Sequence, residues 1–111
     1  MKTLITSATL AILTATTAVA QSQEVISLCR DVGETSYTIM ELRQAGIPQS
    51  EMRSVFATGL DAGSPELTLA LGLVIEAYAI PRFDVGQHQV RASEDFRDEQ
   101  EAMCFRVKAG N

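Results

Sequence analysis

The sequence predicts an all-α protein: a small bundle of about four helices, stapled by one disulfide between the first and last helices. Apolar residues recur at spacings of three and four along most of the chain, which is the periodicity of amphipathic helices. No convincing alternation of apolar and polar residues indicates a strand. Glycines and prolines divide the pattern into four segments, and the two cysteines, Cys29 and Cys104, lie in the first and last of them.

The first twenty residues have the composition of a secretory signal peptide. Lys2 is their only charge, an apolar run rich in Thr and Ala covers 4–15, and a small-x-small triplet ends at Ala20. The run is too short and too rich in threonine for a membrane span, which needs about 20 mostly apolar residues. We therefore predict cleavage after Ala20, a single domain over 21–111, export to the periplasm or the medium, and no stable membrane anchor after cleavage.

The first predicted helix covers 22–45. Its apolar face consists of Val25, Cys29, Val32, Ser36 and Ile39, widened by Leu28 and Met40. Gly33 and Ser36 are small, so a neighbouring helix could pack closely against this part of the face. Gly46 is the expected end of the helix, because glycine tolerates the left-handed conformation that closes many helices.

A second, short helix is predicted from Pro48 to Gly59, because proline is tolerated in a first turn, where its missing N–H would be unpaired. The third helix is predicted over 64–80, with Ser64 as its cap. This helix is apolar almost all round, so we expect it to be central in the domain. Its narrow polar line consists of Thr68, Gly72 and Glu76.

The fourth predicted helix follows Asp84, and Cys104 lies next to its apolar stripe. That stripe consists of Ala92, Phe96, Met103 and Val107. The opposite face is rich in acids and arginines, and two pairs spaced four apart could attract weakly, Arg91 with Asp95 and Arg97 with Glu101. A calcium site is the less favoured interpretation, because calcium needs about six to eight converging oxygens and a continuous helix splays its carboxylates.

Cys29 and Cys104 are the only cysteines, and exported thiols usually pair. Closing so long a loop would stabilise the fold by about 4–5 kcal/mol, as an upper figure from loop-closure entropy. The Cys-x-x-Cys spacing of redox enzymes is absent, zinc would lack nearby histidine ligands, and nothing brings the single histidine, His88, to either sulfur. We predict a structural disulfide, no metal site and no cofactor.

Composition and the absence of catalytic motifs favour a protein-binding role over nucleic-acid binding and catalysis. A net charge of −5 without a basic run argues against nucleic acid. No phosphate loop, nucleophile elbow or zinc-protease motif is present, so we predict no catalytic residues and no enzyme. The leading hypothesis is an exported interaction or accessory module, such as an inhibitor or a binding subunit, with an unidentified protein partner. The alternative is an acid- or envelope-stress chaperone of the periplasm that loosens as paired carboxylates protonate.

Four residues are candidates for a site. Glu76 lies inside the most apolar helix, and if it is buried, it is a candidate acid or switch; the favoured interpretation is that it faces solvent or pairs with Arg82. Tyr78, Arg82 and Phe83 cluster around Pro81 and are a candidate interface, because aromatics and arginine are enriched at binding hot spots. Packing is the alternative for the two aromatic residues.

The stretches CRDVGETSYTIMELRQAGIP, IEAYAIPRF and EDFRDEQEAMCF resemble a set of small exported proteins of proteobacteria and their prophages. The residues that carry the resemblance are Cys29, Ile39, Met40, Arg43, Gln44, Gly46, Ile75, Glu76, Ala77, Tyr78, Pro81, Arg82 and Cys104. The resemblance covers most of the mature chain and implies the helices and the disulfide, but no activity. A looser similarity is to periplasmic acid-stress chaperones, from which this chain departs in its cysteine spacing and its lack of tryptophan.

Overall fold

The computed structural model describes the backbone of residues 10–109 and the side chains of residues 22–109, and within this range it contains four helices and no strand. The helices are α1 (Leu10–Gln44), α2 (Gln49–Gly59), α3 (Pro65–Tyr78) and α4 (Gly86–Ala109). The predicted all-α class and the number of helices are confirmed.

Helix α1 begins at Leu10 rather than at Ser22, so the predicted cleavage point after Ala20 lies within a continuous helix. Cleavage stays a prediction, and residues 1–9 of the predicted signal peptide lie outside the described residues. Of the four helices, none is both long enough and apolar enough to cross a membrane.

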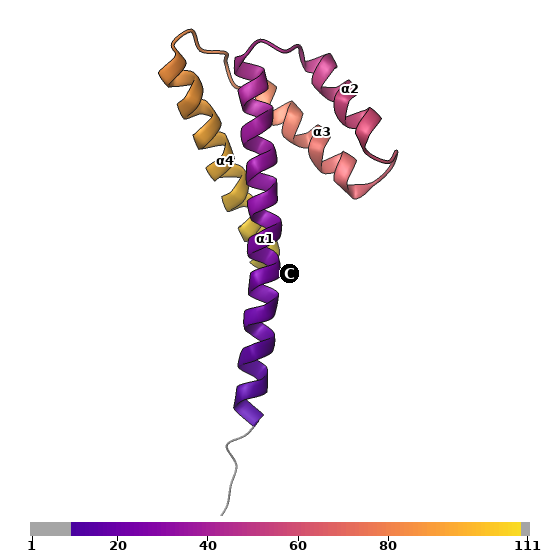
Figure 1. The fold of residues 1–111 in the computed structure, drawn as a ribbon, viewed down its shortest axis with the longest axis vertical. Helices are drawn as coiled ribbons and strands as arrows, with labels where there is room; N and C mark the ends of the chain where they lie inside the picture. Colours follow the sequence, from indigo (N-terminus) through magenta and orange to yellow (C-terminus); the bar gives the residue numbers. More distant parts are fainter. Residues whose placement is uncertain (1–9, 110–111) are drawn as a thin grey trace, which may run out of the picture.

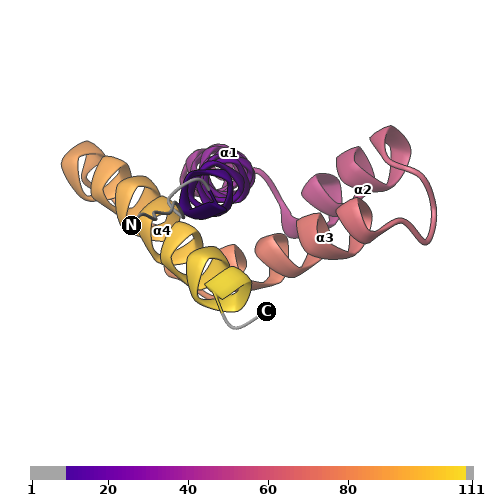
Figure 2. The same ribbon diagram turned by 90° about the horizontal axis from the view of Figure 1, so that it is seen from below.

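Helix α1 is the centre of the arrangement. Helix α4 runs antiparallel to α1 and packs along it, α3 packs against another side of α1, and α2 packs mainly against α3. Figures 1 and 2 show α2 and α3 as a hairpin that stands away from the axis of α1. The first and last helices are therefore neighbours, as predicted.

The predicted central position of α3 is wrong. Its buried face consists of Ala70, Leu73, Val74 and Ala77. The predicted polar line is exposed, and the exposed surface extends beyond it to Leu69 and Ile75, which are 47% and 54% exposed. Because α1 and the short α2 cover only part of its circumference, an almost wholly apolar helix is left half open.

The hydrophobic core lies where the C-terminal half of α1 meets α3, and all four helices contribute to it. Its buried members are Ile39, Met40, Met52, Leu73, Val74, Ala77 and Phe96. Phe96 reaches the cluster from α4 and is only 2% exposed. The cluster therefore joins the hairpin of α2 and α3 to the pair formed by α1 and α4.

Small residues bring α1 and α4 together. Gly33 and Ser36 are buried, and a Cβ atom on Gly33 would lie 2.9 Å from Glu101 Cγ and 3.1 Å from Arg97 Cγ. The Ser36 hydroxyl donates to Val32 O at 2.7 Å and so stays satisfied within its own helix. The predicted close approach at these two positions is confirmed.

The predicted charge pairs along α4 are not formed. Within the described side chains, the only ion pair joins Arg97 Nε to its neighbour Asp98 Oδ1 at 3.1 Å. The guanidinium of Arg97 also lies over the ring of Tyr37, 5.4 Å from the ring centroid. Arg97 thus contacts α1 through the ring of Tyr37. Among the described side chains, Arg91 forms no ion pair with Asp95, and Arg97 forms none with Glu101.

Replacing Gly33 with leucine is expected to lower the free energy of unfolding by about 1–3 kcal/mol, because the larger side chain would force α4 away from α1. The matched control is Gly72→Leu in α3, where a Cβ atom would meet nothing within 4 Å. That variant should gain about 0.5–1 kcal/mol, since glycine is a poor residue for a helix interior. Urea denaturation measures both, and equal effects would contradict the close approach of α4 at Gly33.

Candidate functional site

The end of α1 is joined to the turn between α3 and α4 by hydrogen bonds through Gln44. This side chain is buried; its amide nitrogen donates to Pro81 O at 2.9 Å, and its amide oxygen accepts from Phe83 N at 2.8 Å. In return, Arg82 Nε donates to Gln44 O at 2.9 Å. The bonded residues are 37 to 39 positions apart in sequence, so one glutamine fixes two distant segments.

Helix α1 ends in a Schellman turn. Gly46 has φ +94°, its N–H donates to Arg43 O at 3.1 Å, and Ile47 N donates to Leu42 O at 3.1 Å. A Cβ atom on Gly46 would lie 3.4 Å from the guanidinium of Arg82. The predicted helix end is confirmed, and the positive φ is what requires glycine here, because the guanidinium of Arg82 would be in ordinary van der Waals contact with a Cβ atom.

Tyr78 is half-buried against the core at the same place. Its hydroxyl donates to Ile47 O, and the guanidinium of Arg43 lies 5.0 Å from its ring centroid. Burial raises the pKa of Tyr78, and the positive charge of Arg43 offsets this only in part. The phenol is therefore held in its neutral, donating form.

Because the pKa of Tyr78 is raised in the folded state, the protonated phenol stabilises the fold at pH values below its ordinary pKa of 10.0. This stabilisation is lost as the pH rises through the pKa of the folded state. In a Tyr37→Phe variant, Tyr78 is the only tyrosine left. Ultraviolet absorbance of tyrosinate should then show a midpoint above that of the same variant unfolded in urea. Coinciding midpoints would contradict the burial of the phenol.

The candidate interface of Tyr78, Arg82 and Phe83 is thus mostly engaged within the protein. Phe83 is half-buried, its carbonyl accepts from Gln89 Nε2 at 2.6 Å, and its ring meets that of His88 edge to face. Tyr78 therefore packs against the core, as the packing explanation expects, whereas Phe83 is not among the residues that pack against the core cluster. Arg82 is exposed, and its role at an interface stays a prediction.

The two motifs that carry the resemblance to small exported proteins form the two halves of one contact. The end of α1 supplies Arg43, Gln44 and Gly46. The end of α3 and the turn after it supply Tyr78, Pro81 and Arg82. Residues of these types are needed there to satisfy buried backbone groups and to close a helix, so the motifs have a structural role.

Substituting Gln44 with leucine is expected to cost about 2–3 kcal/mol of stability, because it leaves Pro81 O and Phe83 N without partners in a partly buried place. Gln87→Leu is the matched control, since Gln87 is exposed at the start of α4. It should change stability by less than about 0.5 kcal/mol. Thermal unfolding followed by circular dichroism measures both variants, and similar losses would mean that the Gln44 bonds contribute little.

Glu76 is not a buried acid. It is exposed on α3 together with Thr68 and Gly72, so the favoured solvent-facing interpretation is confirmed and Glu76 is not the buried acid that was considered as a candidate. The physical reason is the orientation of α3, which turns its 70–73–74–77 face toward the core. Arg82, the suggested partner, bonds the end of α1 instead.

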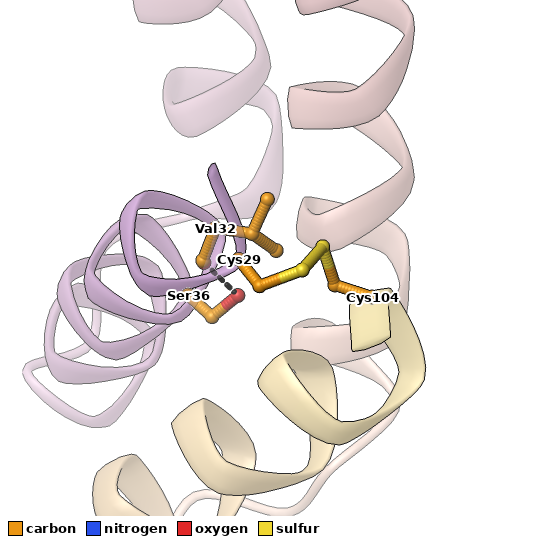
Figure 3. Close-up of a disulfide and its surroundings, with 4 residues drawn as sticks. All are labelled: Cys29, Val32, Ser36 and Cys104. Atoms are coloured by element: carbon orange, nitrogen blue, oxygen red, sulfur yellow. Dashed lines mark hydrogen bonds between the residues drawn. A yellow bond between two sulfur atoms is a disulfide. The ribbon is translucent and has the colours of Figure 1, made fainter. Parts of the chain in front are cut away.

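Cys29 and Cys104 form the predicted disulfide between α1 and α4, with Cα atoms 5.5 Å apart (Figure 3). Cys29 is fully buried and Cys104 half-buried. Because both sulfurs are bonded, neither serves as a nucleophile or a metal ligand in this state. Across residues 22–109, no three His, Cys, Asp or Glu side chains are grouped so that they could hold a metal ion.

An open apolar groove lies between α1 on one side and the hairpin of α2 and α3 on the other, and we call it the α1–α2–α3 groove. It consists of two adjoining cavities of about 590 and 310 Å³, which share Thr35 and Phe56. Its main apolar lining consists of Leu28, Val32, Ile39 and Leu42 from α1, Met52, Val55 and Phe56 from α2, and Leu69 and Leu73 from α3.

The groove combines exposed apolar side chains with an acidic rim. Leu28, Leu42, Val55 and Leu69 are between 37% and 61% exposed, which is high for residues of this type in so small a domain. The charged residues that line the two cavities are all acids, Asp31, Glu34, Glu51 and Glu66. No lysine or arginine lines either cavity.

A third cavity of about 390 Å³ extends the groove toward the end of α4 and shares Leu28 and Leu69 with it. Met103 and Val107 line this extension and are 37% and 57% exposed. They belong to the predicted apolar stripe of α4 but lie outside the core, because the α2–α3 hairpin packs against the other half of α1 and leaves this end of α4 uncovered.

Sequence analysis missed the groove, although the sequence carries a signal for it. Leu28 and Leu42 lie four turns apart on α1 and one position away from the stripe that contains Cys29. A helix that places apolar residues on this second stripe has a second surface to cover. The helical periodicity alone places Leu28 at the edge of the apolar face of this helix and predicts no second surface.

Comparisons with known proteins identify no relative of this chain. No protein-family model matches the chain, and neither a curated protein nor a solved structure matches it. The resemblance to small exported proteins therefore stays a prediction.

Proposed function

We propose that this protein is an exported, non-enzymatic binding module that takes an apolar helical segment of another polypeptide into the α1–α2–α3 groove. The open groove with its exposed Leu42, Val55 and Leu69 is the observation that carries the proposal. Burying apolar area provides most of the free energy of such contacts. The disulfide supports the exported setting, because structural disulfides persist mainly outside the reducing cytoplasm.

The chemistry around the groove supports a binding role over catalysis. A carboxylate pair would need one member whose environment keeps it protonated, and the two acids of the larger cavity, Glu34 and Glu51, are both exposed. The single histidine, His88, lies on α4 beside Phe83 and lines neither cavity. An acid–base or nucleophile–base arrangement therefore has no support in this groove.

The test uses a synthetic helical peptide with a leucine stripe and an otherwise neutral glutamine surface. Amide chemical shifts of the disulfide-bonded protein should move at residues of the groove, and fluorescence anisotropy gives the affinity. Val55→Gln and Leu69→Gln should each weaken binding about tenfold, since each removes most of a buried aliphatic side chain. Ile75→Gln is the matched control, because Ile75 is equally exposed on α3 but lines neither cavity.

Equal losses in all three variants, or shifts confined to other surfaces, would contradict the proposal. An inhibitor and a binding subunit both fit it, and they differ in which protein supplies the helical segment.

A periplasmic stress chaperone is the second candidate, and the same open apolar groove favours it, because unfolded clients expose apolar segments. Its expected acid sensitivity has less support: in residues 22–109 a single exposed pair, Arg97 with Asp98, joins a carboxylate to a base. Circular dichroism at low and neutral pH separates the two functions. A chaperone should loosen in acid and then suppress aggregation of an unrelated unfolded protein, whereas a dedicated binding module should do neither.

A further inference from the structure

We infer that the occupant of the α1–α2–α3 groove is a cationic amphipathic helix about four turns long, with Lys or Arg on both edges of its apolar stripe. This inference rests on the proposed function and specifies the chemistry of the partner. It is carried by the charge of the two walls, by the length of the groove and by the apolar floor between the walls.

In the two cavities that form the groove, the charged wall residues are all acids, and Lys108 lines only the extension toward the end of α4. Asp31 and Glu34 lie on the α1 wall, and Glu51 and Glu66 lie on the opposite wall, from α2 and α3. Carboxylates on both sides of an apolar cleft focus a negative potential into it. A helix with basic residues on both edges of its apolar face would pair with both walls, and the apolar stems of Lys and Arg would cover the rim.

The length of the groove sets the length of the helix. The α1 wall extends from Leu28 to Leu42, which is about 21 Å at 1.5 Å per residue, or about four turns. A partner helix can contact such a wall with residues at spacings of three, four and seven. A helix also satisfies its own backbone hydrogen bonds, so it can enter an apolar groove without leaving polar groups unpaired.

Other occupants fit the charge less well. A second copy of this chain would bring further negative charge, since the net charge is −5 and the exposed face of α4 is rich in acids. An anionic lipid surface would be repelled by the same rim. Both occupants are nevertheless outcomes that the experiment can detect.

The experiment compares three peptides of about 15 residues that share one leucine stripe and carry Lys, Gln or Glu at the positions flanking it. Fluorescence anisotropy with the disulfide-bonded protein measures affinity at low and high salt. At low salt the Lys peptide should bind about tenfold more tightly than the Gln peptide, and the Glu peptide should bind more weakly than both. High salt should shrink these differences, because exposed charges are screened.

Charge-removing variants locate the effect. Glu34→Gln combined with Glu51→Gln should remove most of the preference for the Lys peptide over the Gln peptide. The matched control is Glu94→Gln combined with Glu99→Gln on the exposed face of α4. This control removes the same charge away from the groove and should keep the preference.

The outcomes separate the inference from the proposed function. If the Gln peptide binds in the groove and the Lys peptide binds no more tightly, the inference is overturned and the proposed function stands. If no peptide binds, or if Val55→Gln leaves binding unchanged, the proposed function fails and the inference fails with it. A dimer in sedimentation experiments whose formation Val55→Gln abolishes, or binding to anionic vesicles through the groove, would assign another occupant and overturn the inference.

Discussion

Replacing both Cys29 and Cys104 with alanine is expected to lower the free energy of unfolding by up to about 4–5 kcal/mol. The disulfide closes a loop with a sequence separation of 75 residues, and constraining so long a loop removes a large part of the conformational entropy of the unfolded chain. A domain of this size has a total stability on the order of 5–10 kcal/mol, so the loss would leave the fold marginal. Urea denaturation followed by circular dichroism measures it.

The disulfide also ties the end of α4 to α1. The buried residues of α1 and α4 nearest to it include small or polar ones such as Gly33, Ser36 and Gln100. Without the bond the end of α4 should open more readily, so amide hydrogen exchange should become fast after Gln100 in the double variant. Reduction of the unmodified protein should reproduce the loss, and the variant should not respond to reductant. A stability within about 1 kcal/mol of the original would contradict the role of the bond.

Truncating Phe96 to alanine is expected to cost about 3–5 kcal/mol, the usual range for a fully buried phenylalanine. Phe96 is the contribution of α4 to the core cluster that contains Ile39, Met40 and Val74. Its removal would leave a cavity where α1, α3 and α4 meet, and the surrounding helices could close it only in part. Thermal or chemical unfolding measures the loss.

Phe105→Ala is the matched control for this prediction. Phe105 lies on the same helix but is only half-buried and is outside the core cluster. Its truncation should cost about 1–2 kcal/mol, in proportion to the smaller area that it buries. If both substitutions cost the same, Phe96 does not hold the helices together in the way that its burial implies.

The helices could be predicted because their signals are local. Each signal acts over one or two turns. The signals are the spacings of three and four between apolar residues, Ser64 before Pro65, and Gly46 two residues after Gln44. The structure accordingly has a cap at Ser64 and the turn that closes α1 at Gly46. The pairing of Cys29 with Cys104 followed from their being the only two cysteines in a chain whose first twenty residues predict export. No knowledge of which helix packs against which was needed for either conclusion.

The role of the two motifs was decided by tertiary structure. Arg43, Gln44 and Gly46 are separated from Tyr78 and Arg82 by more than thirty positions, and no periodicity relates segments so far apart. Only when α3 returns to the end of α1 does Gln44 meet Pro81 and Phe83. For this reason, residues that we had considered for an interface are largely engaged in holding the fold.

Local spacing and a count of cysteines are enough to predict the four helices, the disulfide and the approximate limits of every helix except the start of α1, which begins at Leu10 and not at Ser22. Tertiary structure alone decided that α1 rather than α3 is central, that Glu76 faces solvent, and that Met103 and Val107 line an open surface. An apolar residue looks the same in sequence whether a neighbouring helix covers it or not. The angle at which the α2–α3 hairpin leaves α1 (Figure 1) settles that question. The cavities between the hairpin and α1 form the open groove.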